Sequence, residues 1–174
     1  LWLGESSVAK GYAEANLGRC AEGIGRLRSG ITGLHRIGDW HHRSHWLGLL
    51  AHACLETGAD REALAALDQA LEATAATQER YYAPELERLR GAVLARQGRS
   101  DDAAACFETA LRLAATMGAK SLELRAAVSL ARLWGERGRR AEAHDLLASV
   151  YSWFSEGFGT ADLKDAKALL DRLA

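Results

Sequence analysis

Hydrophobic and polar residues follow one another along this chain with the spacing of amphipathic helices, and residues 119–138 show the pattern most clearly. The large apolar side chains of this stretch recur at helical spacing, at Leu122, Leu124, Val128, Leu130, Leu133 and Trp134, which places them on one broad helix face. Gly138 follows the last of them, and glycine commonly ends a helix because it adopts a positive φ without steric cost. We therefore predict one helix and its end in residues 119–138.

Four glycines recur along the chain at steps of 40 residues: Gly18, Gly58, Gly98 and Gly138. Seven positions before each of them, and five positions after, the residue is always Gly or Ala. Nine positions after, it is always large and apolar: Leu27, Leu67, Phe107 and Leu147. Self-similarity at a fixed period indicates a solenoid of repeated helix pairs. We expect the small residues to mark a close crossing within each pair and the large ones to fill the space between pairs.

This register predicts an all-α fold, a right-handed α-solenoid of four helix pairs followed by a C-terminal capping helix. We expect one domain over residues 1–174, with repeats at about 1–38, 40–78, 79–118 and 119–158 and the capping helix at 160–173. The capping helix is expected because the last pair of a solenoid otherwise leaves an apolar face exposed. Aromatic residues just before it are expected to fill the joint beneath it: Tyr151, Trp153, Phe154 and Phe158.

Glycines are concentrated in the second helix of the first repeat, at Gly23, Gly25, Gly30 and Gly33. Each glycine in a helix interior costs about 1 kcal/mol relative to alanine. We therefore expect the first repeat to be the least rigid.

The residue pattern and the period of the repeat point to different repeat types, and we give more weight to the residue pattern. Gly91, Gly98, Ala103, Phe107 and Ala110 resemble the small–glycine–alanine–aromatic–alanine pattern of tetratricopeptide repeats (TPRs). TPRs have a period of about 34 residues, whereas HEAT and armadillo repeats run to about 40–47. HEAT repeats often carry helix-kinking prolines, and this chain of 174 residues has one proline. The pattern therefore favours a TPR-like repeat with lengthened helices and loops.

The net charge limits the classes of partner that the chain could bind, and the cysteine spacing indicates its compartment. The formal net charge is −1, which gives no field to attract nucleic acid or an anionic membrane surface. No apolar run is long enough to span a bilayer. The three cysteines are widely spaced and form no CxxC motif, so we interpret them as reduced thiols. We expect a cytoplasmic protein with no nucleic-acid or membrane partner.

Three histidines suggest the one metal-binding alternative. His41 and His45 lie four residues apart, and His52 follows two helical turns later, so one helix face could offer two or three zinc ligands. No HExxH motif and no acid or cysteine at suitable spacing completes the set. We favour a solvated helix start with groove-lining histidines, and keep a metal-binding or hydrolase domain built on these three residues as an alternative.

Several segments together resemble a known family region. They are Ser121–Trp134, Gly138–Ala143, Tyr151–Phe158, Asp162–Leu170, Glu85–Gly91 and Trp46–Ala51. They resemble the C-terminal TPR region of bacterial multidomain regulators, in which an adenylate/guanylate cyclase or a winged-helix DNA-binding domain precedes an AAA-like signalling ATPase. The resemblance implies a segment of a longer chain whose enzymatic and DNA-binding parts lie upstream.

A non-enzymatic segment is also what the residues predict. The sequence contains no P-loop, GxSxG or HExxH motif, and its acids recur beside Arg and Lys as on a solvated helix face. We therefore predict no catalytic residue and no cofactor. Function would then depend on a surface that binds a protein or a peptide, or the upstream ATPase domain of the same chain.

The first helix of each pair is expected to line the concave side of the solenoid. Positions thirteen, ten and six residues before each turn glycine would face it, which gives the binding candidates His45, His52, Glu85, Arg88, Arg125 and Arg132. Arginine forks suit carboxylates or phosphates, so we expect a mildly basic groove for an acidic peptide, a partner helix or the ATPase domain of the same chain. The alternative is that these arginines pair with Glu85, Glu123 and Glu136 within the stack. An RNA-binding helical array also remains possible from the repeats alone.

Overall fold

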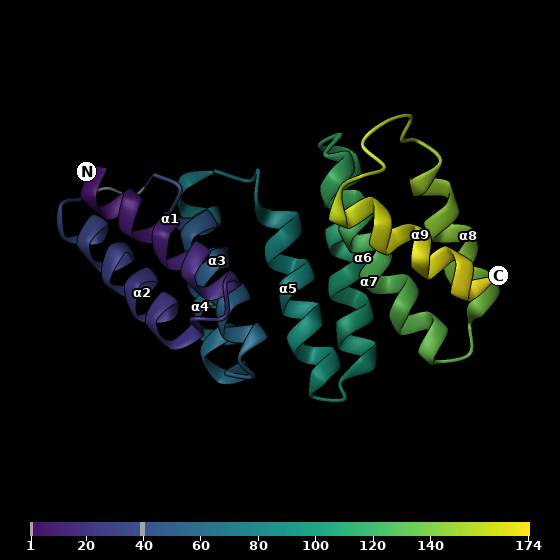
Figure 1. Cartoon of the computed structure of the whole chain (residues 1–174), viewed down its shortest axis with the longest axis horizontal. Coiled ribbons are helices and arrows are strands. Elements are labelled where there is room, and N and C mark those ends of the chain that lie inside the picture. Colours follow the sequence, from purple (N-terminus) through teal and green to yellow (C-terminus); the bar gives the residue numbers. More distant parts are fainter. Residues whose placement is uncertain (1, 39–40) are drawn as a thin grey trace. The chain divides into compact units, whose positions relative to one another are not determined.

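The computed structural model describes residues 2–38 and 41–174 (Figure 1). Within these ranges every regular element is a helix: α1 (Trp2–Asn16), α2 (Cys20–Arg36), α3 (Arg43–Glu56), α4 (Asp60–Thr77), α5 (Ala83–Arg96), α6 (Ser100–Thr116), α7 (Lys120–Glu136), α8 (Arg140–Tyr151) and α9 (Ala161–Leu173). This confirms the all-α class. The expected starts of the first two repeats, at residues 1 and 40, lie outside the described residues.

The four turn glycines end the first helix of each pair, as predicted. Each has a positive φ, between +75° and +86°. The residue after each glycine donates its backbone N–H to the carbonyl five positions earlier, with N···O distances of 2.9–3.0 Å in all four repeats. This is the hydrogen bond of a Schellman motif, and it satisfies a carbonyl that the helix end leaves without a partner. The same turn therefore recurs every 40 residues.

The helices form two compact units, Leu1–Tyr82 and Ala83–Ala174. In the first unit α1 packs against α2, α3 packs against α4, and α2 and α1 both contact α3. In the second unit α5 packs against α6 and α7, α7 against α6 and α8, and α9 against α7 and α8. Consecutive helices are thus neighbours in each unit, which is the arrangement of stacked helix pairs. The single domain over residues 1–174 stays a prediction.

Small residues let the paired helices approach to backbone contact. A Cβ atom added to Gly11 would lie 2.8 Å from the carbonyl oxygen of Gly23, and one added to Gly23 would lie 2.5 Å from the carbonyl oxygen of Gly11. In the second unit a Cβ on Gly91 would lie 2.6 Å from the ring of Phe107. These positions were predicted to be crossing points, and the geometry confirms it.

Two of the four glycines in α2 have a packing role. A Cβ on Gly30 would lie 2.8 Å from the side chain of Val8 and 3.0 Å from the carbonyl oxygen of Gly4, and Gly23 meets α1 as described above. Gly25 and Gly33 are exposed, and a Cβ there would meet nothing within 4 Å. The close contact of α1 with α2 therefore depends on Gly23 and Gly30, and the lower rigidity of this repeat remains a prediction.

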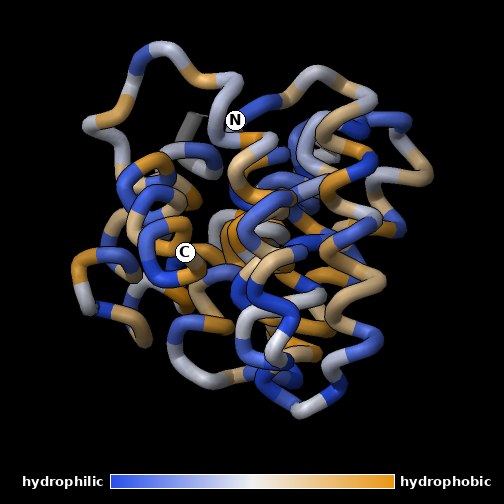
Figure 2. Tube along the Cα trace, turned by 90° about the vertical axis from the view of Figure 1, so that its right-hand side faces the viewer, coloured by the Kyte–Doolittle hydropathy of each residue, from blue (hydrophilic) through white to orange (hydrophobic). Residues whose placement is uncertain are grey.

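The large apolar residues of the register form the core of each unit. Leu27, Leu67 and Leu147 are fully buried and Phe107 is 3% exposed. In the tube view hydrophobic and hydrophilic positions alternate along the helices (Figure 2). The capping helix α9 buries Leu163, Ala166, Leu169 and Leu173 against α7 and α8.

The expectation for the aromatic residues before α9 is half wrong. Tyr151 and Phe154 pack against the core that α9 covers, whereas Trp153 is 60% exposed and Phe158 is 48% exposed. Because α8 ends at Tyr151, helical periodicity no longer determines which of the following residues face the core, and Phe154 does so while Trp153 and Phe158 do not. Trp153 instead contacts Phe154, at 5.2 Å between ring centroids, and the ammonium group of Lys120.

Substitution of the α2 glycines by alanine tests this packing. Gly25→Ala is expected to raise the free energy of unfolding by about 1 kcal/mol, because it removes only the conformational freedom of an exposed helical glycine. Gly23→Ala is expected to lower it by about 1–3 kcal/mol, because the new methyl group meets backbone that cannot rotate away. Urea unfolding followed by circular dichroism measures both, and equal stabilisation by the two changes would contradict the close crossing.

Candidate functional site

The six predicted binding residues fall on three helices in two units. His45 and His52 lie on α3 in the first unit. Glu85 and Arg88 lie on α5, and Arg125 and Arg132 lie on α7, in the second unit. The candidates are therefore divided between the two units.

Glu85 is the centre of a charged network in the second unit. Its side chain is almost fully buried, and its two carboxylate oxygens accept hydrogen bonds from Nε and Nη2 of Arg88 at 2.9 and 2.8 Å. Nη1 of Arg125 lies 3.8 Å from the same carboxylate, and Nε of Arg125 donates to Asp162 of α9 at 2.7 Å. The network therefore joins α5 to α7 through an ion pair and α7 to α9 through a charge-assisted hydrogen bond.

The row of arginines on α7 continues with Arg132, which forms an ion pair with Asp165. Asp162 and Asp165 lie three residues apart on α9, so one edge of this helix supplies an acid to each arginine. Glu123, named as a possible acceptor from the sequence, instead accepts a hydrogen bond from Lys120 at 2.7 Å. Pairing within the stack therefore occurs, through Glu85 as expected and through two acids of α9 that sequence reasoning missed.

The arginines of α7 remain accessible although they are paired. The side chains of Arg125 and Arg132 are 43% and 46% exposed, whereas the side chain of Arg88 is 17% exposed. A guanidinium group carries five N–H donors in a fixed fork, and a single carboxylate does not use all five. A carboxylate that approaches from solvent can therefore reach Arg125 and Arg132, while Arg88 serves chiefly to hold Glu85.

His52 connects the first two repeats in the first unit. Its Nδ1 lies 3.0 Å from the hydroxyl of Tyr12, and both residues stand six positions before a turn glycine. Its Nε2 lies 4.0 Å from a carboxylate oxygen of Glu56. Two residues in equivalent register positions are thus in contact across the first two repeats, and the concave binding face remains a prediction.

His45 occupies an aromatic environment made by the connection between α4 and α5. Its ring meets the ring of Tyr82 edge-on at 4.4 Å between centroids, and Tyr81 lies 6.2 Å away. Its Nδ1 is buried and has no hydrogen-bond partner among the described residues. Burial lowers the pKa of His45 below its usual 6.5, and the nearby His42 lowers it further. A neutral imidazole is therefore favoured at this position.

The histidine alternative gains no support from the geometry. His41 lies beside Glu79, with 3.7 Å between Nδ1 and the carboxylate, while His45 and His52 have the separate partners described above. Among residues 2–38 and 41–174, no group of three or more His, Cys, Asp or Glu side chains is placed to hold a metal ion. In the same part of the chain, no helix is both long and apolar enough to cross a membrane.

Comparison with known proteins shows the fold. No protein-family model matches the chain, and no curated protein matches it in sequence. Two crystal structures of the TPR-like repeats of a Podosopora anserina kinesin light chain match with TM-scores of 0.74 and 0.73, at 19% identity, over 97% of this chain and 84% of theirs. The apo form of RapI matches with a TM-score of 0.75 at 12% identity, over 96% of this chain and 46% of its own. The chain therefore has the fold of a TPR-like α-solenoid.

Removal of the buried carboxylate tests the network of the second unit. Glu85→Ala is expected to lower the free energy of unfolding by about 3–5 kcal/mol, because it leaves the poorly exposed Arg88 without its bidentate partner. Arg132→Ala removes an ion pair that is about half exposed and is expected to change stability by less than about 1 kcal/mol. Chemical denaturation gives both values, and a Glu85→Ala variant as stable as Arg132→Ala would contradict the assigned role.

The pH dependence of stability tests the environment of His45. Because the folded state lowers the pKa of His45, the unfolded state binds a proton more readily as the pH falls through about 6.5. The free energy of unfolding is therefore expected to decrease between about pH 7.5 and about pH 5.5. His45→Phe keeps a ring against Tyr82 and cannot be protonated, so the decrease should be smaller in this variant. Urea titrations at the two pH values measure the difference, and identical slopes would exclude His45 as the cause.

Proposed function

We propose that this chain is a non-enzymatic protein–protein interaction and regulatory module, and that it binds an acidic segment of a protein or peptide through the first helices of its repeats. The observation that carries this proposal is the contact of α9 with α7. An acidic helix edge, Asp162 and Asp165, lies against Arg125 and Arg132, and these arginines keep about half of their side-chain surface exposed. The face therefore already uses the chemistry that an acidic partner would use.

The proposed context is a bacterial signalling regulator. The family resemblance of the sequence suggests an AAA-like signalling ATPase upstream, accompanied by a nucleotide cyclase or a winged-helix domain, and we propose the ATPase domain as the partner. The TPR-like fold supports a role in binding, since stacked helix pairs present extended surfaces. An RNA-binding role would need a basic surface with few acids, whereas the arginines of this face lie beside Glu85, Asp162 and Asp165.

ATP turnover by the full-length protein, with and without residues 1–174, tests this function. If the repeats regulate the ATPase, their removal is expected to change turnover by about fivefold or more. Typical coupling free energies between two sites correspond to factors of about 5 to 150. The double change Arg125→Ala and Arg132→Ala should reproduce most of the effect. Arg112→Ala, an exposed arginine of α6 that contacts Thr109, is the matched control and should leave turnover unchanged. Unchanged turnover in the truncated protein would contradict intramolecular regulation.

A further inference from the structure

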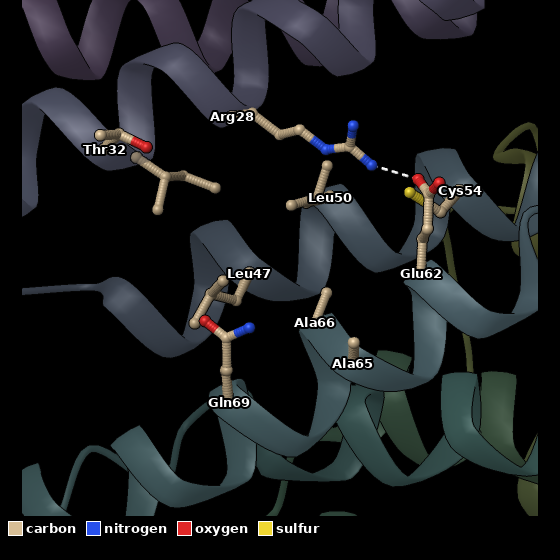
Figure 3. Close-up of a pocket in the computed structure, with 10 residues that line it drawn as sticks. Arg28, Thr32, Leu47, Leu50, Cys54, Glu62, Ala65, Ala66 and Gln69 are labelled. Carbon is tan, nitrogen blue, oxygen red and sulfur yellow. Dashed lines mark hydrogen bonds and ion pairs between the residues drawn. The ribbon is translucent and has the colours of Figure 1, made fainter.

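The first unit contains a cavity of about 350 Å³ among α2, α3 and α4 (Figure 3). Ile31, Leu47 and Leu50 give it apolar walls, and Arg28, Glu62 and Gln69 lie around it with their polar groups. Arg28 and Glu62 form an ion pair across its edge, drawn as a dashed line in the figure. A concave apolar site of this size with a few polar groups at its rim is typical of a ligand site.

Two positions of the 40-residue register carry small residues at this cavity. Four positions before the turn glycine stands Cys54 in the second repeat and Trp134 in the fourth. Eight positions after it stands Ala66 in the second repeat and Leu146 in the fourth. Cys54 and Ala66 both line the cavity. Cys54 and Ala66 are thus the smallest residues that the four repeats carry at these two positions, and both face the same cavity.

The equivalent joint of the second unit shows what such a space accommodates. Trp134 and Leu146 pack there against the buried residues of α5, α6 and α7. The guanidinium group of Arg139 lies over the Trp134 ring, 4.2 Å from its centroid, which is a favourable cation–π distance. An indole ring is thus held between helices of consecutive pairs, with its face against an arginine.

The side chains around the first unit's cavity could also accommodate an indole ring. The Arg28 guanidinium at the rim can cover an aromatic face, and the Glu62 carboxylate and the Gln69 amide oxygen can accept an N–H. Burial raises the pKa of the Cys54 thiol, so the base of the cavity carries no charge at neutral pH. A neutral planar ring with one N–H at its edge satisfies both the apolar walls and the polar rim.

We propose that this cavity binds a tryptophan side chain supplied by a protein partner, its ring filling the space beside Cys54 and Ala66 and its N–H facing Glu62 and Gln69. Aromatic anchors in pockets contribute a large share of the affinity at protein interfaces. The site is separate from the arginines of α7, and the proposal adds a second, apolar anchor to the proposed binding function.

Titration of the isotope-labelled chain with N-acetyl-tryptophanamide tests this site by NMR. The expected result is saturable shifts of backbone signals from α2, α3 and α4 around the cavity, with a weaker response to N-acetyl-leucinamide. Ala66→Leu and Cys54→Leu insert the larger side chains that Leu146 and Leu94 provide at the same register positions. Each is expected to weaken binding by about tenfold or more. Cys106→Leu, at the register position of Ala66 but in the second unit, should leave binding unchanged.

Absence of saturable shifts overturns the proposal, and so do equal affinities in the unaltered and filled proteins. If both filled variants fail to fold, alkylation of the unaltered protein decides. Cys54 lines the cavity while Cys20 and Cys106 lie elsewhere, so bound probe should slow modification of Cys54 alone. An unchanged rate at Cys54 would refute binding there. Neither measurement depends on ATP turnover, which tests the arginine face. Failure of this proposal can therefore be distinguished from failure of the proposed ATPase regulation.

Discussion

Backbone contact between the two helices of a pair is the constraint on which the rest of this structure depends. Gly11 and Gly23 meet with no room for a Cβ atom on either side, and Gly91 leaves none between α5 and α6. Because the helices cross this closely, the residues beyond the crossing are fixed in direction, and Leu27 or Phe107 can enter the core at the next turns. The Schellman turns at the register glycines recur at the same position of every repeat.

Once the pairs are fixed, their outward faces determine what the chain can bind. In the second unit the faces of α5 and α7 carry a buried carboxylate and a row of arginines, and α9 completes them with two acids. In the first unit the equivalent positions carry histidines beside tyrosines. The cavity beside Cys54 is the opposite case, because there the packing between consecutive pairs is incomplete. The arginine row and the cavity thus lie in different units and on different register positions of their repeats.

The register could be predicted because periodicity carries it: one glycine, two small residues and one large residue per repeat determine the turns, the crossings and the core. The exposure of Trp153 and Phe158 could not, since a loop has no period from which side-chain direction follows. The pairing of Arg125 with Asp162 was missed for a related reason, because spacing gives a helix face but not the rotamers on it. The sequence shows only that Cys54 is smaller than Trp134 at the same register position, which does not by itself predict a cavity.

The most direct test of this account is a nuclear Overhauser measurement on the isolated chain. The structure places the Cβ position of Gly11 at 2.8 Å from the backbone nitrogen of Leu27, and that of Gly23 at 2.6 Å from the backbone nitrogen of Ala15. We therefore expect cross-peaks from the α-protons of Gly11 to the amide proton of Leu27, and from those of Gly23 to the amide proton of Ala15. Absence of both cross-peaks in the folded protein would mean that α1 and α2 are separated by a layer of side chains, and would contradict the close crossing.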